Sequence, residues 1–311
     1  MKDIARPLIN DEQIVSFLEA IDFRNYFSIQ ENIDIAFHGM NDIDAMLAKA
    51  ITLIKQANND LLDVVDNNSL ESDKHRSHPY KTDESREKLR NTIFEELINH
   101  KRVGNDEEIC LGTGGMLPSS GKAKMERQAI IIIGLPASGK SRIAAKVSDY
   151  YDAVLIDSDF AKRKIPEFFK TNGATLVHKE SKIIIDEILK AAISNGVNLV
   201  LPIIGSEFDG VKGTINSLKR HKYSVRLILV ELDRVKATQR ALRRFIQTNR
   251  YVPLSMILDD YANNPSLVFY KLLSNSTFNN LPMALIDTDV PFGTRPNMVI
   301  QRKFSDIHKI I

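Results

Sequence analysis

The sequence contains a single cysteine, Cys110, so no disulfide can form within the chain. One unpaired cysteine fits a reducing compartment, and nothing near Cys110 marks it as a nucleophile. No apolar run approaches the 18 or so residues of a membrane span, and the longest is AIIIIGLPA. The first residues, MKDIARPLINDEQ, lack an apolar core of signal-peptide length. We therefore expect a cytoplasmic protein with no membrane partner.

The chain also has little net charge, because 42 Lys and Arg nearly balance 40 Asp and Glu and leave a formal charge of +2. Bulk charge therefore gives no reason to expect nucleic acid as a partner, and any electrostatic function must come from local clusters. The chain has 311 residues, of which 43% are hydrophobic. That is enough for one large domain or two of ordinary size.

Helical periodicity dominates the first part of the chain. Ile14, Phe17, Leu18 and Ile21 recur at helical spacing, and a second such pattern follows a predicted cap at Asn41. The polar stretch 67–85 predicts a linker, and a third helix is expected directly after it. We place a helical domain at residues 1–75, the core of the linker at 76–83 and a second domain at 84–311.

The pattern changes in the second domain, where short runs rich in β-branched residues alternate with helical patterns at 178–195 and 234–247. Buried strands that alternate with helices predict an α/β fold, with a parallel sheet flanked by helices. The predicted strands lie within 128–136, 152–159, 197–205, 224–233 and 281–289.

Two stretches resemble phosphate-binding loops, MLPSSGK at 116–122 and GLPASGK at 134–140. The motif requires a strand, then G-x-x-x-x-G-K-[ST], then a helix. The second stretch meets each requirement and predicts a P-loop NTPase-type sheet, with backbone N–H groups and a helix N-terminus around the phosphates. Its residues are Gly134, Leu135, Pro136, Ala137, Ser138, Gly139, Lys140 and Ser141.

In a P-loop, the lysine reaches the β- and γ-phosphates of a nucleotide and the hydroxyl holds Mg²⁺. Lys140 and Ser141 would take these roles, so we expect ATP and Mg²⁺ as cofactors. The first stretch has Met116 in place of the first glycine and Ala123 in place of Ser or Thr. We interpret Gly112–Lys122 as a flexible surface turn, with a loop that contacts the ligand as the alternative.

Acidic and basic residues near the later strands suggest an acceptor side. Asp157 and Asp159 end the second predicted strand, where a carboxylate could accept a proton from an acceptor hydroxyl or help to hold Mg²⁺. A simple strand-end turn is the alternative interpretation. Downstream, arginines could neutralise a phosphoryl transition state, or they could form a solvated basic face. They are Arg240, Arg243, Arg244 and Arg250.

The P-loop, followed by IDSDFAK, VHKESKIIIDEILKAAISNGVNLVL and the arginine segment, resembles the zeta-toxin family of P-loop kinases from about residue 84 to 255. Members of that family phosphorylate a sugar hydroxyl of UDP-N-acetylglucosamine and so block bacterial cell-wall synthesis. The resemblance implies that Asp159 is the catalytic base and that Glu180 and Asp186 lie near the sugar. It favours Arg244 and Arg250 as the phosphate-binding arginines, with Arg240 and Arg243 as substitutes.

One segment departs from the family pattern. The third predicted strand continues into LVLPIIGSEF, with Pro202 and Ile203 where the family usually has an acidic residue and a threonine. Asp157, Ser206 or Glu207 are candidates to compensate. The alternatives to a UDP-N-acetylglucosamine kinase are therefore a kinase of another small molecule, such as a nucleotide cofactor or antibiotic, and a non-catalytic module switched by ATP.

The family is usually inhibited by a separate helical antitoxin that covers the nucleotide site. The resemblance therefore suggests that residues 1–75 are an inhibitory domain within the same chain. The alternative is a helical appendage for folding or dimerisation.

Overall fold

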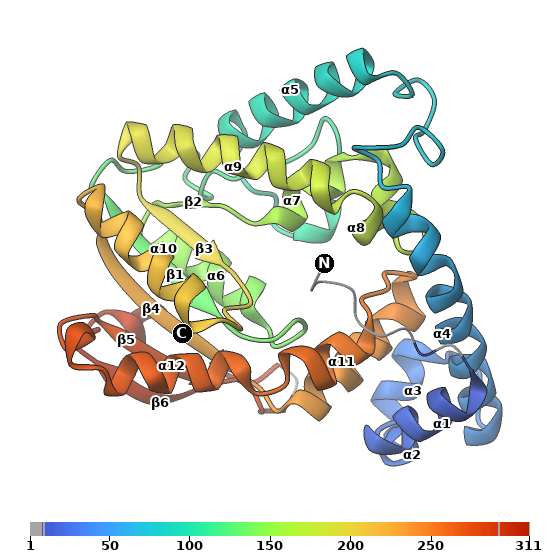
Figure 1. Ribbon diagram of the computed structural model, residues 1–311. Helices are drawn as coiled ribbons and strands as arrows, with labels where there is room; N and C mark the ends of the chain where they lie inside the picture. Colours follow the sequence, from blue (N-terminus) through green and yellow to red (C-terminus); the bar gives the residue numbers. More distant parts are fainter. Residues whose placement is uncertain (1–7, 9, 292, 311) are drawn as a thin grey trace. The chain divides into compact units, whose positions relative to one another are not determined.

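The computed structural model describes residues 8, 10–291 and 293–310 (Figure 1). Residues 1–7, on which the expectation about a signal peptide partly rests, lie outside the described residues. The chain forms two compact units, each assembled from separate segments. The first unit contains Met1–Thr82, Pro166–Lys179 and Asp233–Ala262, and the second contains Asp83–Ile165, Glu180–Leu232 and Asn263–Ile311.

The second unit is built on a six-stranded sheet in the order β2-β3-β1-β4-β5-β6. The first five strands in this order run parallel, and β6 pairs antiparallel with β5. The fold class predicted from the sequence is confirmed. The strands are β1 (Gln128–Ile133), β2 (Val154–Leu155), β3 (Leu199–Pro202), β4 (Ser224–Glu231), β5 (Met283–Asp287) and β6 (Asn297–Arg302).

Burial explains which strands the sequence reveals. Residues 129–133 of β1 are wholly buried, as expected for a central parallel strand covered on both faces. The strand β6 was not predicted, because its residues alternate between exposed and half-buried and form a weak apolar pattern at the sheet edge.

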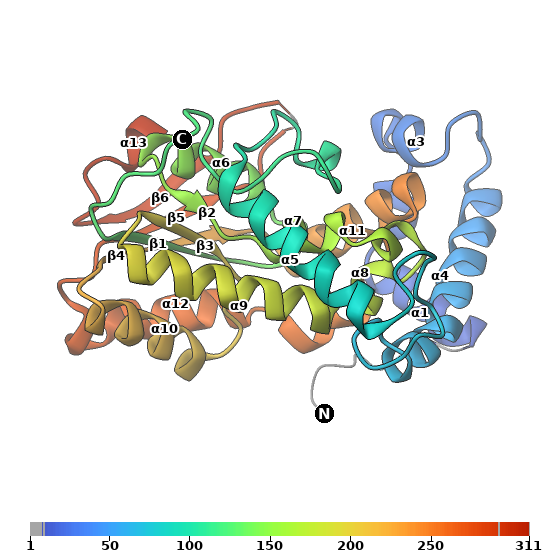
Figure 2. The same cartoon turned by 90° about the horizontal axis from the view of Figure 1, so that it is seen from above.

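Helices cover both faces of this sheet. Figure 2 shows α6 and α13 on one face and α9, α10 and α12 on the other, while α5 packs against α7. The helices of the second unit are α5 (Asp83–Asn99), α6 (Lys140–Tyr150), α7 (Ser158–Lys164), α9 (His178–Asn195, whose first two residues belong to the first unit), α10 (Phe208–Arg220), α12 (Asn264–Ser274) and α13 (Ile307–Ile310). Short 3-10 turns lie at Asp106–Glu108 and Ser276–Phe278.

The first unit is helical. Its core includes Ile14, Phe17, Leu18 and Ile21, the residues whose spacing predicted the first helix. Its elements are α1 (Asp11–Ala20), α2 (Phe23–Tyr26), α3 (Gln30–Ala36), α4 (Ile43–Asp66), α8 (Gly173–Leu176), α11 (Arg234–Thr248), a 3-10 turn at Pro166–Phe169 and a π-helical turn at Met256–Tyr261.

One local expectation needs correction. The cap of α4 is Asp42, whose carboxylate accepts from the Asp44 backbone N–H at 3.0 Å, and Asn41 lies one residue before it. The segment after α4 has no helix or strand up to α5, but it is not an unrestrained tether. Arg76 is buried there, and its guanidinium donates to the backbone oxygens of Ser69 and Leu70.

Each helix in the described part of the chain is either too short or too polar to span a membrane.

Candidate functional site

The loop after β1 has the strand–loop–helix geometry of a phosphate-binding loop. A Cβ added to Gly134 would lie 2.4 Å from the backbone oxygen of Val230, so this position requires glycine. Gly139 has φ +90°, a left-handed conformation that favours glycine, and α6 begins at the next residue. Backbone N–H groups at the start of α6 are thus available to an anion.

Two side chains of this loop fit a phosphate ligand. The Lys140 Nζ donates to the backbone oxygens of Gly134 and Leu135, at 2.7 and 2.6 Å, and therefore lies over the loop. The Ser138 side chain is wholly buried, and its Oγ has no hydrogen-bond partner within the described residues. A buried hydroxyl without a partner is costly, and a phosphate oxygen could satisfy it.

Asp157 and Asp159 follow β2, at the same sheet edge as the P-loop. Both β1 and β2 run parallel to β3, which lies between them, so their carboxyl ends lie roughly 10 Å apart. Asp157 caps α7, and its Oδ1 accepts from the Asp159 backbone N–H at 2.9 Å. Asp159 lies in the first turn, and its side chain, 36% exposed, accepts from the Lys162 Nζ at 3.2 Å.

The surroundings of Asp157 disfavour the charged form of its carboxylate. The pKa of Asp157 is raised to about 6, chiefly by burial and in addition by the negative charge of Asp159. Binding of a divalent cation would relieve this penalty. A carboxylate here and the exposed Ser141 hydroxyl are hard oxygen ligands of the kind that Mg²⁺ prefers. The described residues contain no cluster of three or more His, Cys, Asp or Glu that could hold a metal without further ligands.

Thr288, the residue directly after β5, was not predicted as a site residue. Its side chain is 8% exposed, and its Oγ1 lies 2.7 Å from the Ser138 backbone oxygen and 3.0 Å from that of Glu231. Its backbone N–H also donates to Glu231 at 3.1 Å. Thr288 therefore ties the P-loop to the ends of β4 and β5. The apolar run of β5 predicts that the next residue lies at the carboxyl edge of the sheet, and this signal could have identified Thr288.

The similar stretch at 116–122 lies elsewhere in the second unit. The Ser119 backbone N–H donates to Asp149 near the C-terminal end of α6, at 2.8 Å. The P-loop is at the opposite end of that helix, roughly 16 Å away. Met116 is wholly buried and its backbone oxygen accepts from the Leu155 N–H of β2. The stretch therefore begins in the core at Met116, whereas Ser119, Ser120 and Lys122 are exposed in the surface turn that follows.

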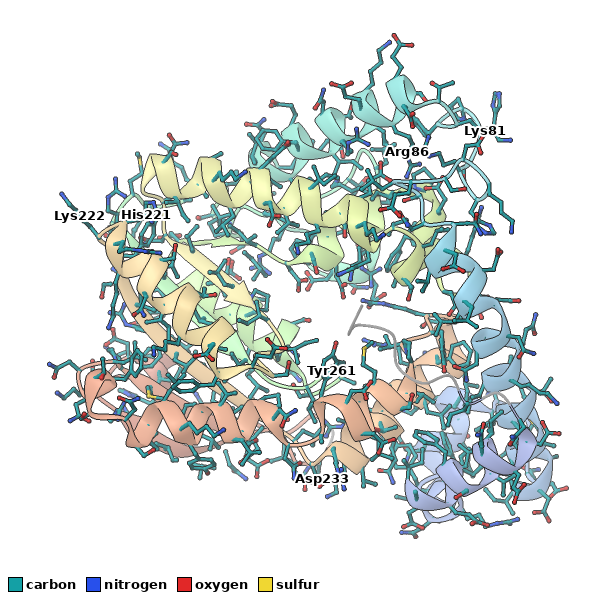
Figure 3. All side chains as sticks on the ribbon, in the orientation of Figure 1. Lys81, Arg86, His221, Lys222, Asp233 and Tyr261 are labelled. Atoms are coloured by element: carbon teal, nitrogen blue, oxygen red, sulfur yellow. The ribbon has the colours of Figure 1, made fainter. Side chains whose placement is uncertain are left out.

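The two acidic residues expected near a sugar differ in environment. Glu180 is wholly buried and forms ion pairs with Arg86 and Arg90 of α5. Figure 3 labels Arg86 on that helix. Asp186 is exposed on α9. Glu180 already satisfies a buried guanidinium, so contact with a substrate would require it to exchange partners. Its role in substrate binding stays a prediction.

No acidic residue directly follows β3, so compensation by Asp157, Ser206 or Glu207 stays a prediction. The strand ends at Pro202, and neither Ile203 nor Ile204 supplies a carboxylate. Glu207 is exposed just before α10 and Ser206 is half-buried.

The four candidate arginines belong to the first unit, whereas the P-loop and Asp159 belong to the second. Arg240, Arg243 and Arg244 lie on α11, which begins after Asp233 (Figure 3). The Arg243 Nη1 donates to the Asn32 Oδ1 at 2.6 Å. The Arg250 guanidinium lies 5.3 Å from the centre of the Phe168 ring, within reach of a cation–π interaction.

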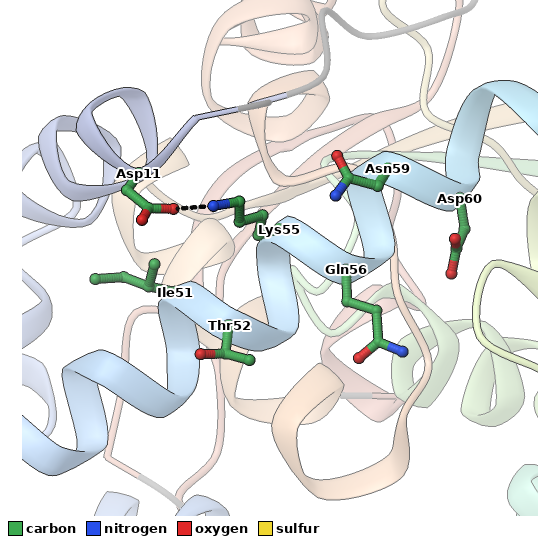
Figure 4. Close-up of a pocket in the computed structure, with 7 residues that line it drawn as sticks. All are labelled: Asp11, Ile51, Thr52, Lys55, Gln56, Asn59 and Asp60. Atoms are coloured by element: carbon green, nitrogen blue, oxygen red, sulfur yellow. Dashed lines mark hydrogen bonds and ion pairs between the residues drawn. The ribbon is translucent and has the colours of Figure 1, made fainter.

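A polar hollow in the first unit contains none of these residues. It lies along α4, where the Lys55 Nζ is 2.8 Å from the Asp11 Oδ1 (Figure 4). Its lining has no arginine, histidine or cysteine, and the ion pair already neutralises Lys55. The lining residues are Asp11, Ile51, Thr52, Lys55, Gln56, Asn59 and Asp60.

Comparison with known proteins agrees with the site geometry. Residues 119–271, just under half of the chain, match the family model described as Zeta toxin. No curated protein matches. A structure from the PezAT chromosomal toxin-antitoxin system of Streptococcus pneumoniae has a TM-score of 0.51 and 14% identity, covering 76% of this chain and 90% of that chain.

Two structures of AvrRxo1-ORF1 with ORF2 are also similar. The one with ATP has a TM-score of 0.44 and 17% identity, covering 72% of this chain and 70% of that one. The native complex has a TM-score of 0.45 and 15% identity, covering 75% and 73%. The sheet order and the similarity to the PezAT structure show that the chain has a P-loop kinase-like fold. Residues 119–271 match the sequence pattern of the zeta toxins.

Proposed function

We propose that this protein is an ATP-dependent kinase that phosphorylates a hydroxyl of a nucleotide sugar, UDP-N-acetylglucosamine in the first instance, and acts as a toxin in bacteria. The observation that carries this proposal is the glycine-dependent loop between β1 and α6, with Asp159 at the same sheet edge. A phosphate-binding loop alone suits many reactions. A carboxylate at the acceptor side favours transfer to a hydroxyl.

In the proposed reaction, the acceptor hydroxyl oxygen bonds to the γ-phosphorus of ATP while the bond to the β–γ bridging oxygen breaks and ADP leaves. Asp159 accepts the hydroxyl proton. Lys140 and the N–H groups at the start of α6 hold the phosphates, and Ser138 can donate its buried hydroxyl to one of their oxygens. Bound Mg²⁺, held by Ser141 with Asp157, would neutralise negative charge on the phosphates.

Two alternative functions make different demands on these residues. A kinase of another small molecule would use the same P-loop and Asp159 with a different acceptor. A module switched by ATP would need Lys140 and Ser141 but no base. The similar structure from the PezAT toxin–antitoxin system also favours a separate antitoxin as a binding partner.

The distinguishing experiment measures ATP affinity by calorimetry and ADP release in the presence of an acceptor panel. Lys140→Ala should weaken both, because the charge on the β- and γ-phosphates is lost. Asp159→Ala should keep nearly normal affinity but lower turnover by about 10²–10⁴. Near-normal turnover of Asp159→Ala excludes its role as the base.

Toxicity is tested with the same variants. Expression of the wild type in bacteria should arrest growth, and Lys140→Ala should not. Equal arrest by both would separate toxicity from kinase chemistry.

A further inference from the structure

The N-terminal helices share a compact unit with the helix that carries three of the candidate arginines. Gln239, in the first half of α11, joins this helix to the residue that caps the end of α1, because its Nε2 donates to the Ile21 backbone oxygen at 2.7 Å. Gln239 is 8% exposed and Ile21 is wholly buried. This bond joins residues 218 positions apart in sequence and lies inside a packed interface.

The middle of α11 is held by α3, which packs against it. Asn32 is 7% exposed, and its carboxamide makes two bonds. Its Oδ1 accepts from the Arg243 Nη1 at 2.6 Å, and its Nδ2 donates to the Tyr26 backbone oxygen at 2.8 Å. Because Asn32 is fixed from both sides, it fixes the direction of the Arg243 guanidinium.

The chain after α11 is held by α4. The Tyr251 hydroxyl donates to the Asn58 Oδ1 at 2.9 Å, and both residues are buried. The Tyr251 ring also packs against Phe245, in the last turn of α11, with ring centres 4.8 Å apart. The N-terminal segment therefore contacts α11 at Gln239, one turn later at Arg243, and just beyond its end at Tyr251.

We infer that residues 10–66 are a positioning scaffold for α11 and Arg250, with Asn32 and Gln239 as positioning residues. This inference rests on the proposed function only for the consequence in catalysis. A long arginine side chain loses substantial conformational freedom when it is ordered. A helix held at three places can keep such side chains in a narrow range of positions. On this account the N-terminal helices support activity, whereas an inhibitory domain would suppress it.

The test compares Asn32→Ala with Asn25→Ala in the full chain. Asn25 is exposed, and its side-chain amide donates to the Asp22 Oδ2 at 3.0 Å within the same short helical segment, so it is a matched control. The first readout is amide hydrogen exchange in α11, which needs no substrate. Losing one buried hydrogen bond should speed exchange in α11 about three- to tenfold. Asn25→Ala should leave it unchanged.

The second readout is ATP turnover with the acceptor. Asn32→Ala should lower kcat more than it raises the KM for ATP. Asn32→Asp keeps the acceptor for Arg243 but loses the donor to the Tyr26 backbone oxygen, so it should recover only part of the loss. If Asn32→Ala does not fold, Tyr251→Phe removes one hydroxyl and keeps the ring packing, and the same two readouts apply.

Unchanged exchange in α11 overturns the inference, and so does an unchanged or raised kcat. A raised kcat is the result that an inhibitory N-terminal domain predicts. If the wild type has no turnover, the proposed function fails, and hydrogen exchange alone then decides whether the N-terminal helices hold α11.

Discussion

At the scale of single residues, Asp157 combines a structural role with an electrostatic penalty. Its carboxylate caps α7, while burial raises its pKa to about 6. The ordinary value is 3.8. Between these values the folded chain holds a proton that the unfolded chain releases. Asp157 therefore lowers the free energy of unfolding as pH rises from about 4 to above 6.

We expect Asp157→Asn to stabilise the protein at pH 7.5 by up to about 3 kcal/mol and to have little effect at pH 4, since asparagine keeps the cap without the charge. Thermal unfolding at both pH values measures this. The control is Asp233→Asn, an exposed aspartate that caps α11. A gain of equal size at both pH values would contradict the assignment.

Thr288 is a residue whose importance appears only in three dimensions. Its hydroxyl is shared between the Ser138 and Glu231 backbone oxygens, so its removal leaves a buried P-loop carbonyl without this donor. Thr288→Val should weaken ATP binding about tenfold, while Thr288→Ser should bind nearly as well as the wild type. Calorimetry with ATP measures both.

The control for that experiment is Thr294→Val. The Thr294 hydroxyl donates to the Pro291 backbone oxygen in the exposed turn between β5 and β6. Wild-type affinity in Thr288→Val would show that the P-loop holds its shape without this bond.

At the scale of elements, α11 and the residues just after it carry the arginines predicted to act in the transition state. Arg244 and Arg250 are the predicted transition-state residues, and Arg250 stacks on Phe168 within the first unit. Lysine keeps the charge but lacks the planar fork of arginine. Arg244→Lys and Arg250→Lys should each lower kcat about tenfold or more, with a smaller change in the KM for ATP.

Steady-state kinetics at saturating acceptor measures this split. Arg24→Lys is the control, because Arg24 is an exposed arginine of the same unit that pairs with Asp44. If both lysine variants keep the wild-type kcat, the interpretation of α11 as a solvated basic face is favoured.

The elements that the sequence predicts well are those with a strong local pattern. Short apolar runs identify β1 to β5, and glycine spacing identifies the P-loop. The stretch at 116–122 shows the limit of such patterns. Only packing against α6 and β2 reveals that Met116 is a core residue and that Ser119 binds the far end of that helix.

At the scale of the whole molecule, the two compact units do not follow the linear division near residue 75–84. Segments 166–179 and 233–262 join the N-terminal helices. Linear composition cannot predict this, because the bonds from Gln239, Arg243 and Tyr251 each span about two hundred residues. The sequence-based domain boundaries therefore remain a prediction about independent folding.

The central claim concerns phosphate transfer to a nucleotide sugar, and the mass of the acceptor tests it most directly. Wild type and Asp159→Ala are each incubated with ATP, Mg²⁺ and UDP-N-acetylglucosamine, and the products are analysed by mass spectrometry. We expect the wild type to add one phosphate to the sugar nucleotide and release an equal amount of ADP, and Asp159→Ala to do neither. ATP binding by the wild type with no phosphate on this acceptor would contradict the claim.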